Sequence, residues 1–212
     1  MFSKNAVKTT LLCGPKELSK SFMFEAATYW AEEGQRVVYV TPVPLQKRPA
    51  VCHDRRDPTV AALKLMRFVY LTDYEALAKQ LFKLHTYAAV PSVLLINDLD
   101  DYLLDDEAFG NDDSRTRIAR ICALILHSMK SCSRILKKRV HVCVWASSSL
   151  TNNFIQTMYF GNIWNLMEKE DGKMISVERF SIGSSLERSY MYYKFQDGMR
   201  VLQQILGDLE EA

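Results

Sequence analysis

Hydrophobic and polar positions alternate between two kinds of segment along the chain. Short apolar runs, typical of buried parallel strands, alternate with stretches in which apolar residues recur every three or four positions, as on one face of a helix. The apolar runs cover residues 11–13, 36–41, 67–71, 92–96 and 140–147, and the helical patterns cover residues 22–33, 61–66, 74–87 and 114–136. This alternation predicts an α/β fold with a mainly parallel sheet flanked by helices.

The pattern changes after Phe160. Residues 163–167 and 174–180 flank the turn Asp171-Gly172, and residues 188–195 and 199–205 flank Asp197-Gly198. Apolar runs joined by Asp-Gly are typical of β-hairpins, so we expect antiparallel strands at the C-terminal end of the sheet. With 212 residues and 48% hydrophobic content, we predict a single domain over residues 1–212, with its antiparallel extension beginning at about residue 160.

One stretch carries the clearest chemical signal, residues 7–21, which read VKTTLLCGPKELSKS. Measured against the phosphate-binding pattern G-x-x-x-x-G-K-[ST], Gly14 takes the first glycine position, and Lys20 and Ser21 take the last two. In that motif backbone N–H groups cradle the phosphates, the lysine reaches the β/γ oxygens and the hydroxyl holds Mg²⁺. We therefore predict a strand–loop–helix connection here, beside the strand that holds Leu94 and Ile96.

The second glycine of the pattern is replaced by Ser19. A serine adds a side chain and restricts φ where the backbone has to approach a phosphate. Pro15 fixes another dihedral of the loop, and Glu17 puts a negative charge near the site. We expect these changes to weaken or abolish phosphate binding. An ordinary strand–turn–helix with a chance Lys-Ser pair is the alternative.

A second polar group follows the most apolar strand, at Asn97 and Asp98. Nucleotide-binding α/β proteins place an aspartate directly after such a strand to hold the water shell of Mg²⁺. Here the first residue is an amide, and side-chain alternation aims Asp98 elsewhere unless the turn redirects it. The stretch therefore predicts either a modified Mg²⁺ site or an acidic surface turn.

Charge and composition limit the choice of ligands. The net charge is only +2, so DNA binding requires a local basic patch. The candidate DNA-binding residues are Lys47, Arg48, Arg55 and Arg56 in a proline-rich loop, and Lys137, Lys138 and Arg139 after the long helix. Each of these is equally explained as an ordinary solvated charge.

Several features argue against other classes of protein. The N-terminal MFSKNAVK has no apolar signal-peptide core, and no apolar run is long enough to span a bilayer, so we expect no membrane contact. The cysteines form no C-x-x-C pair, and Cys52-His53 has no second ligand pair at zinc spacing. We therefore predict no metal centre in this chain and an intracellular, reduced environment.

Taken together, these motifs resemble a known family. The altered phosphate loop at residues 14–21, the strand RVVYVT, the segments TPVPLQKRP and SVLLINDLDDYL, and the terminal hairpins resemble the RecA-like recombinase paralogues. Within that family, the chain is most similar to the small ATPase-core subunit that pairs with a SWIM-type zinc-finger protein in the metazoan Shu complex. The resemblance extends over residues 7–202. It implies a RecA-like P-loop core in which Ser147 to Ser149 lie where such proteins sense the γ-phosphate.

The resemblance also implies a function. A nuclear heterodimer with the SWIM-type partner would bind single-stranded DNA and support recombinase filaments in homologous recombination. The resemblance places Gly14, Lys20 and Ser21 in the P-loop and Asn97 in the Walker B position. Because Ser19 and Asn97 both depart from the family pattern, we expect an accessory subunit that binds ATP and Mg²⁺ weakly or not at all. The alternatives are an active ssDNA-stimulated ATPase, in which Asp98 replaces the missing acid, and an unrelated P-loop nucleotide kinase.

Overall fold

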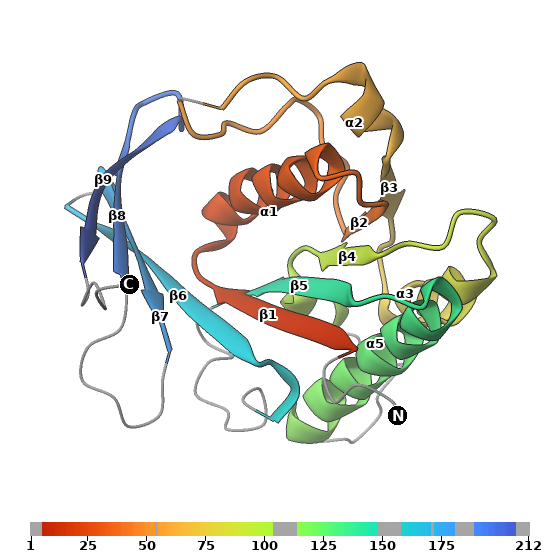
Figure 1. Cartoon of the computed structure of the whole chain (residues 1–212). Coiled ribbons are helices and arrows are strands. Elements are labelled where there is room, and N and C mark those ends of the chain that lie inside the picture. The colour runs from red at the N-terminus through yellow and green to blue at the C-terminus, as the bar shows by residue number, and fades with distance from the viewer. Residues whose placement is uncertain are drawn as a thin grey trace, which may run out of the picture.

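A single twisted sheet runs through the part of the chain described by our computed structural model, residues 6–53, 55–103, 114–147, 158–170, 172–180 and 189–206. It is nine-stranded, with the order β3-β2-β4-β5-β1-β6-β7-β8-β9 (Figure 1). The strands are β1 (Val7–Cys13), β2 (Val37–Thr41), β3 (Met66–Tyr70), β4 (Val93–Ile96), β5 (Val140–Ala146), β6 (Asn162–Lys169), β7 (Met174–Arg179), β8 (Ser189–Lys194) and β9 (Arg200–Leu206).

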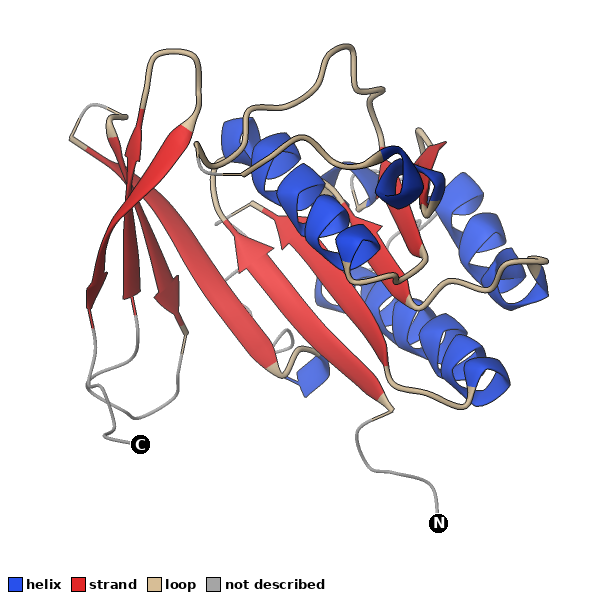
Figure 2. Ribbon diagram, turned by 45° about the horizontal axis from the view of Figure 1, so that its top comes forward, coloured by secondary structure: helices blue, strands red, loops and turns tan. Residues whose placement is uncertain are grey.

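The sheet has a parallel part and an antiparallel part. Strands β1 to β6 pair in parallel, whereas β7, β8 and β9 extend the sheet from β6 in antiparallel order. Figure 2 shows these last strands turned away from the parallel ones, as the right-handed twist of a sheet requires. The expected α/β class and the expected antiparallel addition are both confirmed. The extension of one domain over residues 1–212 stays a prediction.

Helices cover both faces of the parallel part (Figures 1 and 2). They are α1 (Lys16–Glu32), α2 (Val60–Lys64), α3 (Tyr74–Lys83) and α5 (Ser114–Leu136), with 3₁₀ turns η1 (Leu84–Thr86) and η2 (Leu99–Tyr102). Helices α1 and α2 enclose one hydrophobic core with the sheet, and α3 and α5 enclose the other. No described helix combines the length and the apolar character needed to cross a bilayer.

The buried strands explain the two-sided packing. Every residue of β2 and β4 is buried, which is typical of parallel strands covered by helices on both faces.

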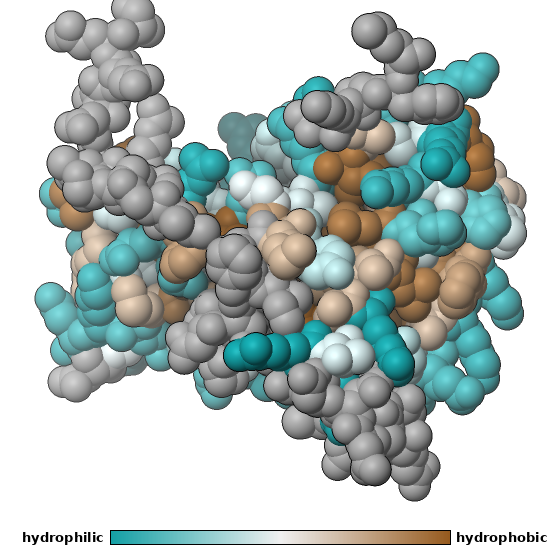
Figure 3. All heavy atoms as spheres, turned by 90° about the horizontal axis from the view of Figure 1, so that it is seen from below, coloured by the Kyte–Doolittle hydropathy of each residue, from teal (hydrophilic) through white to brown (hydrophobic). Residues whose placement is uncertain are grey.

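Seen from below, apolar side chains gather in one part of the molecular surface, and hydrophilic side chains lie around them (Figure 3).

The strand order corrects one expectation. Strand β1 does not lie beside β4, because β5 is inserted between them: Leu11 of β1 pairs with Val144, and Leu94 of β4 pairs with Val142. The carboxyl ends of β1, β5 and β4 still point to the same side of the sheet, here called the carboxyl edge. The opposite side, where these strands begin, is called the amino edge.

Candidate nucleotide site at the carboxyl edge

The connection between β1 and α1 is shorter than a phosphate-binding loop. Only Gly14 and Pro15 separate the strand from the helix, which begins at Lys16. The Gly14 N–H donates to the Ala146 carbonyl at 3.1 Å. A Cβ added to Gly14 would lie 2.9 Å from Leu166 Cβ, so the glycine is required by close packing against β6.

This short connection corrects the predicted position of the motif. Lys20 and Ser21 lie in the second turn of α1 rather than at its head. Their backbone N–H groups form hydrogen bonds within the helix, because only the first turn of a helix leaves such donors unpaired. Glu17 occupies that first turn, where its charge suits the helix dipole but repels an anion. The sequence carries part of the motif without the loop that would cradle phosphates.

The hydroxyl of Ser21 is already engaged. It donates a hydrogen bond to the Ala50 carbonyl and accepts one from the Arg200 guanidinium. The Arg200 side chain is 1% exposed, and it also bonds Glu25 Oε2 at 2.5 Å. Its guanidinium lies 3.9 Å from the centre of the Phe22 ring. The hydroxyl that would bind Mg²⁺ is therefore held by a buried ion pair, and a metal ion would have to displace the Arg200 guanidinium from it.

Lys20 faces a cavity of about 350 Å³ in front of this network. Lys47, from the loop after β2, lines the same cavity, together with Lys194 and Glu17. Lys194 is paired with Glu168 at 2.5 Å, whereas Lys20 and Lys47 form no ion pair with a carboxylate in the described ranges. The structure thus brings together a predicted P-loop lysine and a predicted DNA-binding lysine.

Asn97 and Asp98 directly follow β4, and Asn97 faces Ser19. Asp98 adopts a left-handed conformation with φ of 51°, which redirects its side chain after the strand ends. The Asn97 Nδ2 donates to Ser19 Oγ at 3.2 Å and to Asp98 Oδ2 at 2.8 Å. Burial raises the pKa of Asp98, while the hydrogen bond from Ser19 opposes that rise. The residue that replaces the second glycine is therefore tied to the residue in the Walker B position.

The following acidic residues also have partners. Lys16 binds Asp101 at 2.7 Å, and this hydrogen bond raises the pKa of the Lys16 ammonium. Asp100 accepts bonds from the backbone N–H and the hydroxyl of Ser147 at 2.6 and 2.9 Å. These contacts join η2 to α1 and β5. No cluster of three or more potential metal-binding side chains occurs within the described residues, and Ser148 and Ser149 lie outside them.

The basic loop after β2 is partly neutralised. It passes over α1, between α2 and β9 (Figure 1). Arg48 forms an ion pair with Asp57, and Arg55 binds Glu32 at 2.8 Å. Arg56 lines a pocket with Glu25 and Glu32. The carboxylates around these arginines make the loop a weaker site for a polyanion than its sequence indicates.

The second basic cluster lies elsewhere, at the amino edge before β5. Lys137, Lys138 and Arg139 are all exposed there. Lys138 donates to Gln35 Oε1 at 2.9 Å, a neutral acceptor that leaves its charge uncompensated. The two predicted DNA-binding clusters therefore belong to different surfaces.

Sequence reasoning missed Arg200, Lys16 and Asp101. Arg200 follows an Asp-Gly turn on the last strand, 179 positions after Ser21, and no local pattern connects the two. The Lys16–Asp101 pair spans 85 positions. Both contacts depend on where the chain returns to α1.

These residues do not fit the usual contacts of Mg²⁺-nucleotide. The backbone cradle is absent from the β1–α1 connection, the Ser21 hydroxyl is bound by Arg200, and the amide of Asn97 brings no charge to a cation. What remains are Lys20 and Lys47, which could contact phosphate oxygens in the cavity that they line.

Comparisons with known proteins place this geometry in context. No family model matches the chain. Its sequence is 33% identical to the mouse protein ATPase SWSAP1 over 118 residues, which is 55% of this chain and 40% of the mouse protein. The match thus spans less than half of that relative.

Solved structures show the fold. One solved ATPase domain matches over 96% of this chain and 86% of its own length, with a TM-score of 0.57 and 10% sequence identity. A KaiC-like protein from Pyrococcus horikoshii matches over 94% of this chain and 91% of its own length, with a TM-score of 0.55 and 11% sequence identity. A DnaB-like replicative helicase matches over 95% of this chain and 58% of its own length, with a TM-score of 0.59 and 11% sequence identity. The chain has a RecA-like fold, and its sequence resembles the mouse ATPase SWSAP1.

Proposed function

We propose that this chain is a recombination-associated, RecA-like subunit that acts by binding partners rather than by hydrolysing ATP. In this proposal it forms a nuclear Shu-type heterodimer with a SWIM-type zinc-finger protein and supports a RecA-like recombinase on single-stranded DNA. The sequence match to ATPase SWSAP1 and the RecA-like fold support the choice of family.

One observation carries the non-catalytic part of the proposal, the bond between Arg200 and Ser21. The guanidinium is buried, paired with Glu25 and packed on Phe22. Removing it from this position would leave the Glu25 carboxylate without its partner, so the arrangement resists displacement by Mg²⁺. Ser19 and Asn97, the two residues that depart from the motifs, are hydrogen-bonded to each other, and this bond also supports a non-catalytic role.

The test is to compare the wild-type chain with Lys20→Ala. Affinity purification from cells should recover a SWIM-domain protein and recombinase factors equally well with both chains. Wild-type complex should show no ATP turnover above that of Lys20→Ala. Loss of partner recovery in Lys20→Ala would contradict an accessory role that does not depend on nucleotide.

An active ATPase is the second candidate, and the cavity that Lys20 and Lys47 share favours it. The mouse relative is named as an ATPase, which also favours it. Turnover that is stimulated by single-stranded DNA and abolished by Lys20→Ala would establish this alternative. The RecA-like neighbours and the described residues offer no support for a nucleotide kinase.

A further inference from the structure

Parallel strands begin side by side at the amino edge of the sheet. Val37, the first residue of β2, pairs with Met66 of β3 and with Val93 of β4. Val93 pairs with His141 of β5, and His141 pairs with Lys8 of β1. The residues that open these strands, or directly precede them, therefore lie along one line from β3 to β1.

Basic side chains collect on this line. The residues Lys8, Arg36, Lys64, Arg67, Lys138 and Arg139 are called here the amino-edge strip. All of them are exposed, and none forms an ion pair with a carboxylate in the part of the chain that the structure describes. The strip differs in this respect from the loop over α1, where Arg48 and Arg55 are paired. Its uncompensated charge is suited to an anionic ligand.

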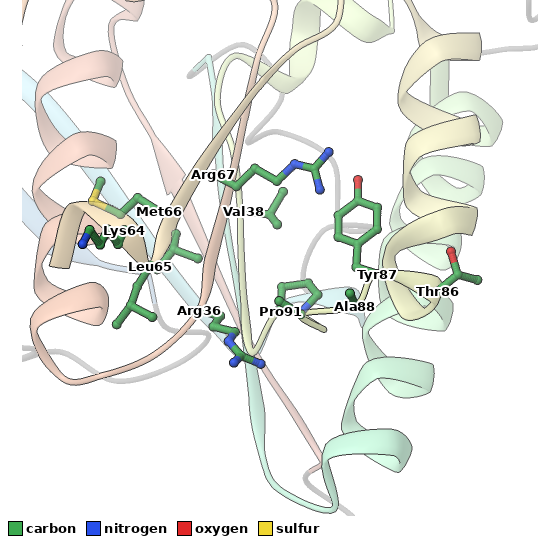
Figure 4. A pocket seen from close by; sticks show the side chains of 12 residues that line it. Arg36, Val38, Lys64, Leu65, Met66, Arg67, Thr86, Tyr87, Ala88 and Pro91 are labelled. Carbon is green, nitrogen blue, oxygen red and sulfur yellow. The ribbon is translucent and has the colours of Figure 1, made fainter. Parts of the chain in front are cut away.

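A pocket of about 600 Å³ opens within the strip, lined by Arg36, Lys64 and Arg67. Figure 4 shows residues 64–67 on one side of it and residues 86–88 on the other, with Arg67 reaching toward Tyr87. The Arg67 guanidinium lies 4.4 Å from the centre of the Tyr87 ring, which holds it in place by a cation–π contact. Leu65 and Pro91 add apolar walls. Volume and lining match pockets that enclose a small organic group.

The length of the strip indicates a polymer. Four intervals separate β3 from β1 in the sheet order, and at about 4.8 Å each they span about 19 Å. A single phosphate could neutralise only part of this line, whereas a chain of phosphates could follow it. The apolar-walled pocket adds room for a planar base, which only a single-stranded polynucleotide offers freely. These features together favour single-stranded nucleic acid over an acidic peptide.

We propose that the amino-edge strip binds the phosphates of a single-stranded polynucleotide and that the pocket beside Arg67 and Tyr87 receives one of its bases. This inference rests on the proposed function and gives its DNA contact a location. The location is the edge of the sheet opposite Lys20 and Ser21, so polynucleotide binding at the strip requires no nucleotide at the carboxyl edge.

The experiment is fluorescence anisotropy of the full chain with a labelled single-stranded DNA, repeated with RNA of the same length and with duplex DNA. Arg36→Gln and Lys138→Gln are combined with a salt titration, and Lys173→Gln is the matched control, because Lys173 is exposed in the β6–β7 turn far from the strip. We expect each strip variant to weaken binding and to lower the salt slope by about 1. Lys173→Gln should change neither.

Each other outcome has a distinct meaning. The Arg36→Gln/Lys138→Gln double variant could bind DNA as tightly as the wild type while Lys47→Gln loses binding. That result would overturn the assignment of DNA binding to the amino-edge strip and leave the proposed function intact. Equal affinity for duplex and single strands would overturn the role of the pocket. Binding of polyglutamate as tight as that of the oligonucleotide would overturn the assignment to nucleic acid. Failure to recover recombination partners, with strip-dependent DNA binding present, would instead contradict the proposed function alone.

Discussion

The guanidinium of Arg200, the first residue of β9, binds the hydroxyl of Ser21 in the second turn of α1. A residue from the antiparallel end of the sheet thereby closes the position where a RecA-like protein would hold its metal ion. The same guanidinium pairs with Glu25 on the next turn of the helix. The C-terminal extension therefore stabilises α1 and blocks part of the candidate nucleotide site at the same time.

We predict that Arg200 and Glu25 are energetically coupled. The Arg200 side chain is 1% exposed, so its removal by Arg200→Met should cost about 3 kcal/mol of unfolding free energy, because Glu25 then loses its partner. The Glu25→Gln/Arg200→Met double variant should recover about 1 kcal/mol or more of this loss. Chemical denaturation of the wild type, both single variants and the double variant measures the coupling.

The Lys194–Glu168 pair provides the control. It has the same N–O distance of 2.5 Å, but its side chains are 26% and 29% exposed. Its coupling should stay below about 1 kcal/mol. Equal coupling in the two pairs would show that burial of Arg200 contributes nothing.

Gly14→Ala should destabilise the protein by about 1–3 kcal/mol, since the added methyl group would meet Leu166 Cβ at 2.9 Å in a packed core. Gly161→Ala is the matched substitution, because the nearest atom to its added Cβ is 3.9 Å away. Thermal unfolding should show a clear loss for the first variant and little change for the second. A neutral Gly14→Ala would mean that β6 does not press against the turn.

The cap of α3 predicts a pH-dependent contribution. Asp73 accepts a bond from the Ala76 N–H at 2.8 Å, and this bond lowers the pKa of its carboxyl. A lowered pKa means that the stabilisation is present above the unfolded value of 3.8 and is lost as the pH falls through the lower, folded value. Asp73→Ala should cost about 1 kcal/mol at pH 7.

Asp73→Asn separates the cap from its charge. The amide oxygen can still accept the Ala76 bond, so this variant should keep most of the stability at pH 7. It should lose the part of the acid dependence of the unfolding free energy that the Asp73 carboxyl contributes. Urea denaturation between pH 2 and pH 7 would reveal both effects. Identical pH profiles for wild type and Asp73→Asn would exclude the predicted linkage.

His141 reports on the amino-edge strip. Burial lowers its pKa from 6.5, and the charges of Lys8, Arg139 and Lys138 lower it further. Because the folded pKa is depressed, this group makes folding less favourable as the pH falls below 6.5. Lys138→Gln should raise the pKa of His141, and so should addition of a single-stranded oligonucleotide. NMR titration of the His141 ring measures both shifts.

Lys173→Gln should leave the His141 titration unchanged, which controls for a general change of net charge. An oligonucleotide that binds the chain without moving the His141 pKa would place the bound phosphates away from the strip.

The local pattern of the chain determined most of its elements. Full burial on both faces of β2 and β4 produces continuous apolar runs, and these identified parallel strands from sequence. The Asp197-Gly198 turn and the Asp73 cap are equally local signals, since the residues that form them are neighbours in the chain. The changes at Ser19 and Asn97 were also visible, because each departs from a fixed spacing.

What the tertiary structure decided is how those residues are used. Helix α1 begins at Lys16 rather than near Lys20, and Leu166 of β6 packs closely against Gly14, where the chain turns from β1 into the helix. Arg200 reaches Ser21 only because the antiparallel strands bring the end of the chain back over α1. Likewise, Lys8, Arg36 and Lys138 share one surface only because parallel strands begin at the same edge. Sequence spacing records local geometry, whereas these contacts depend on strand order, which no local pattern contains.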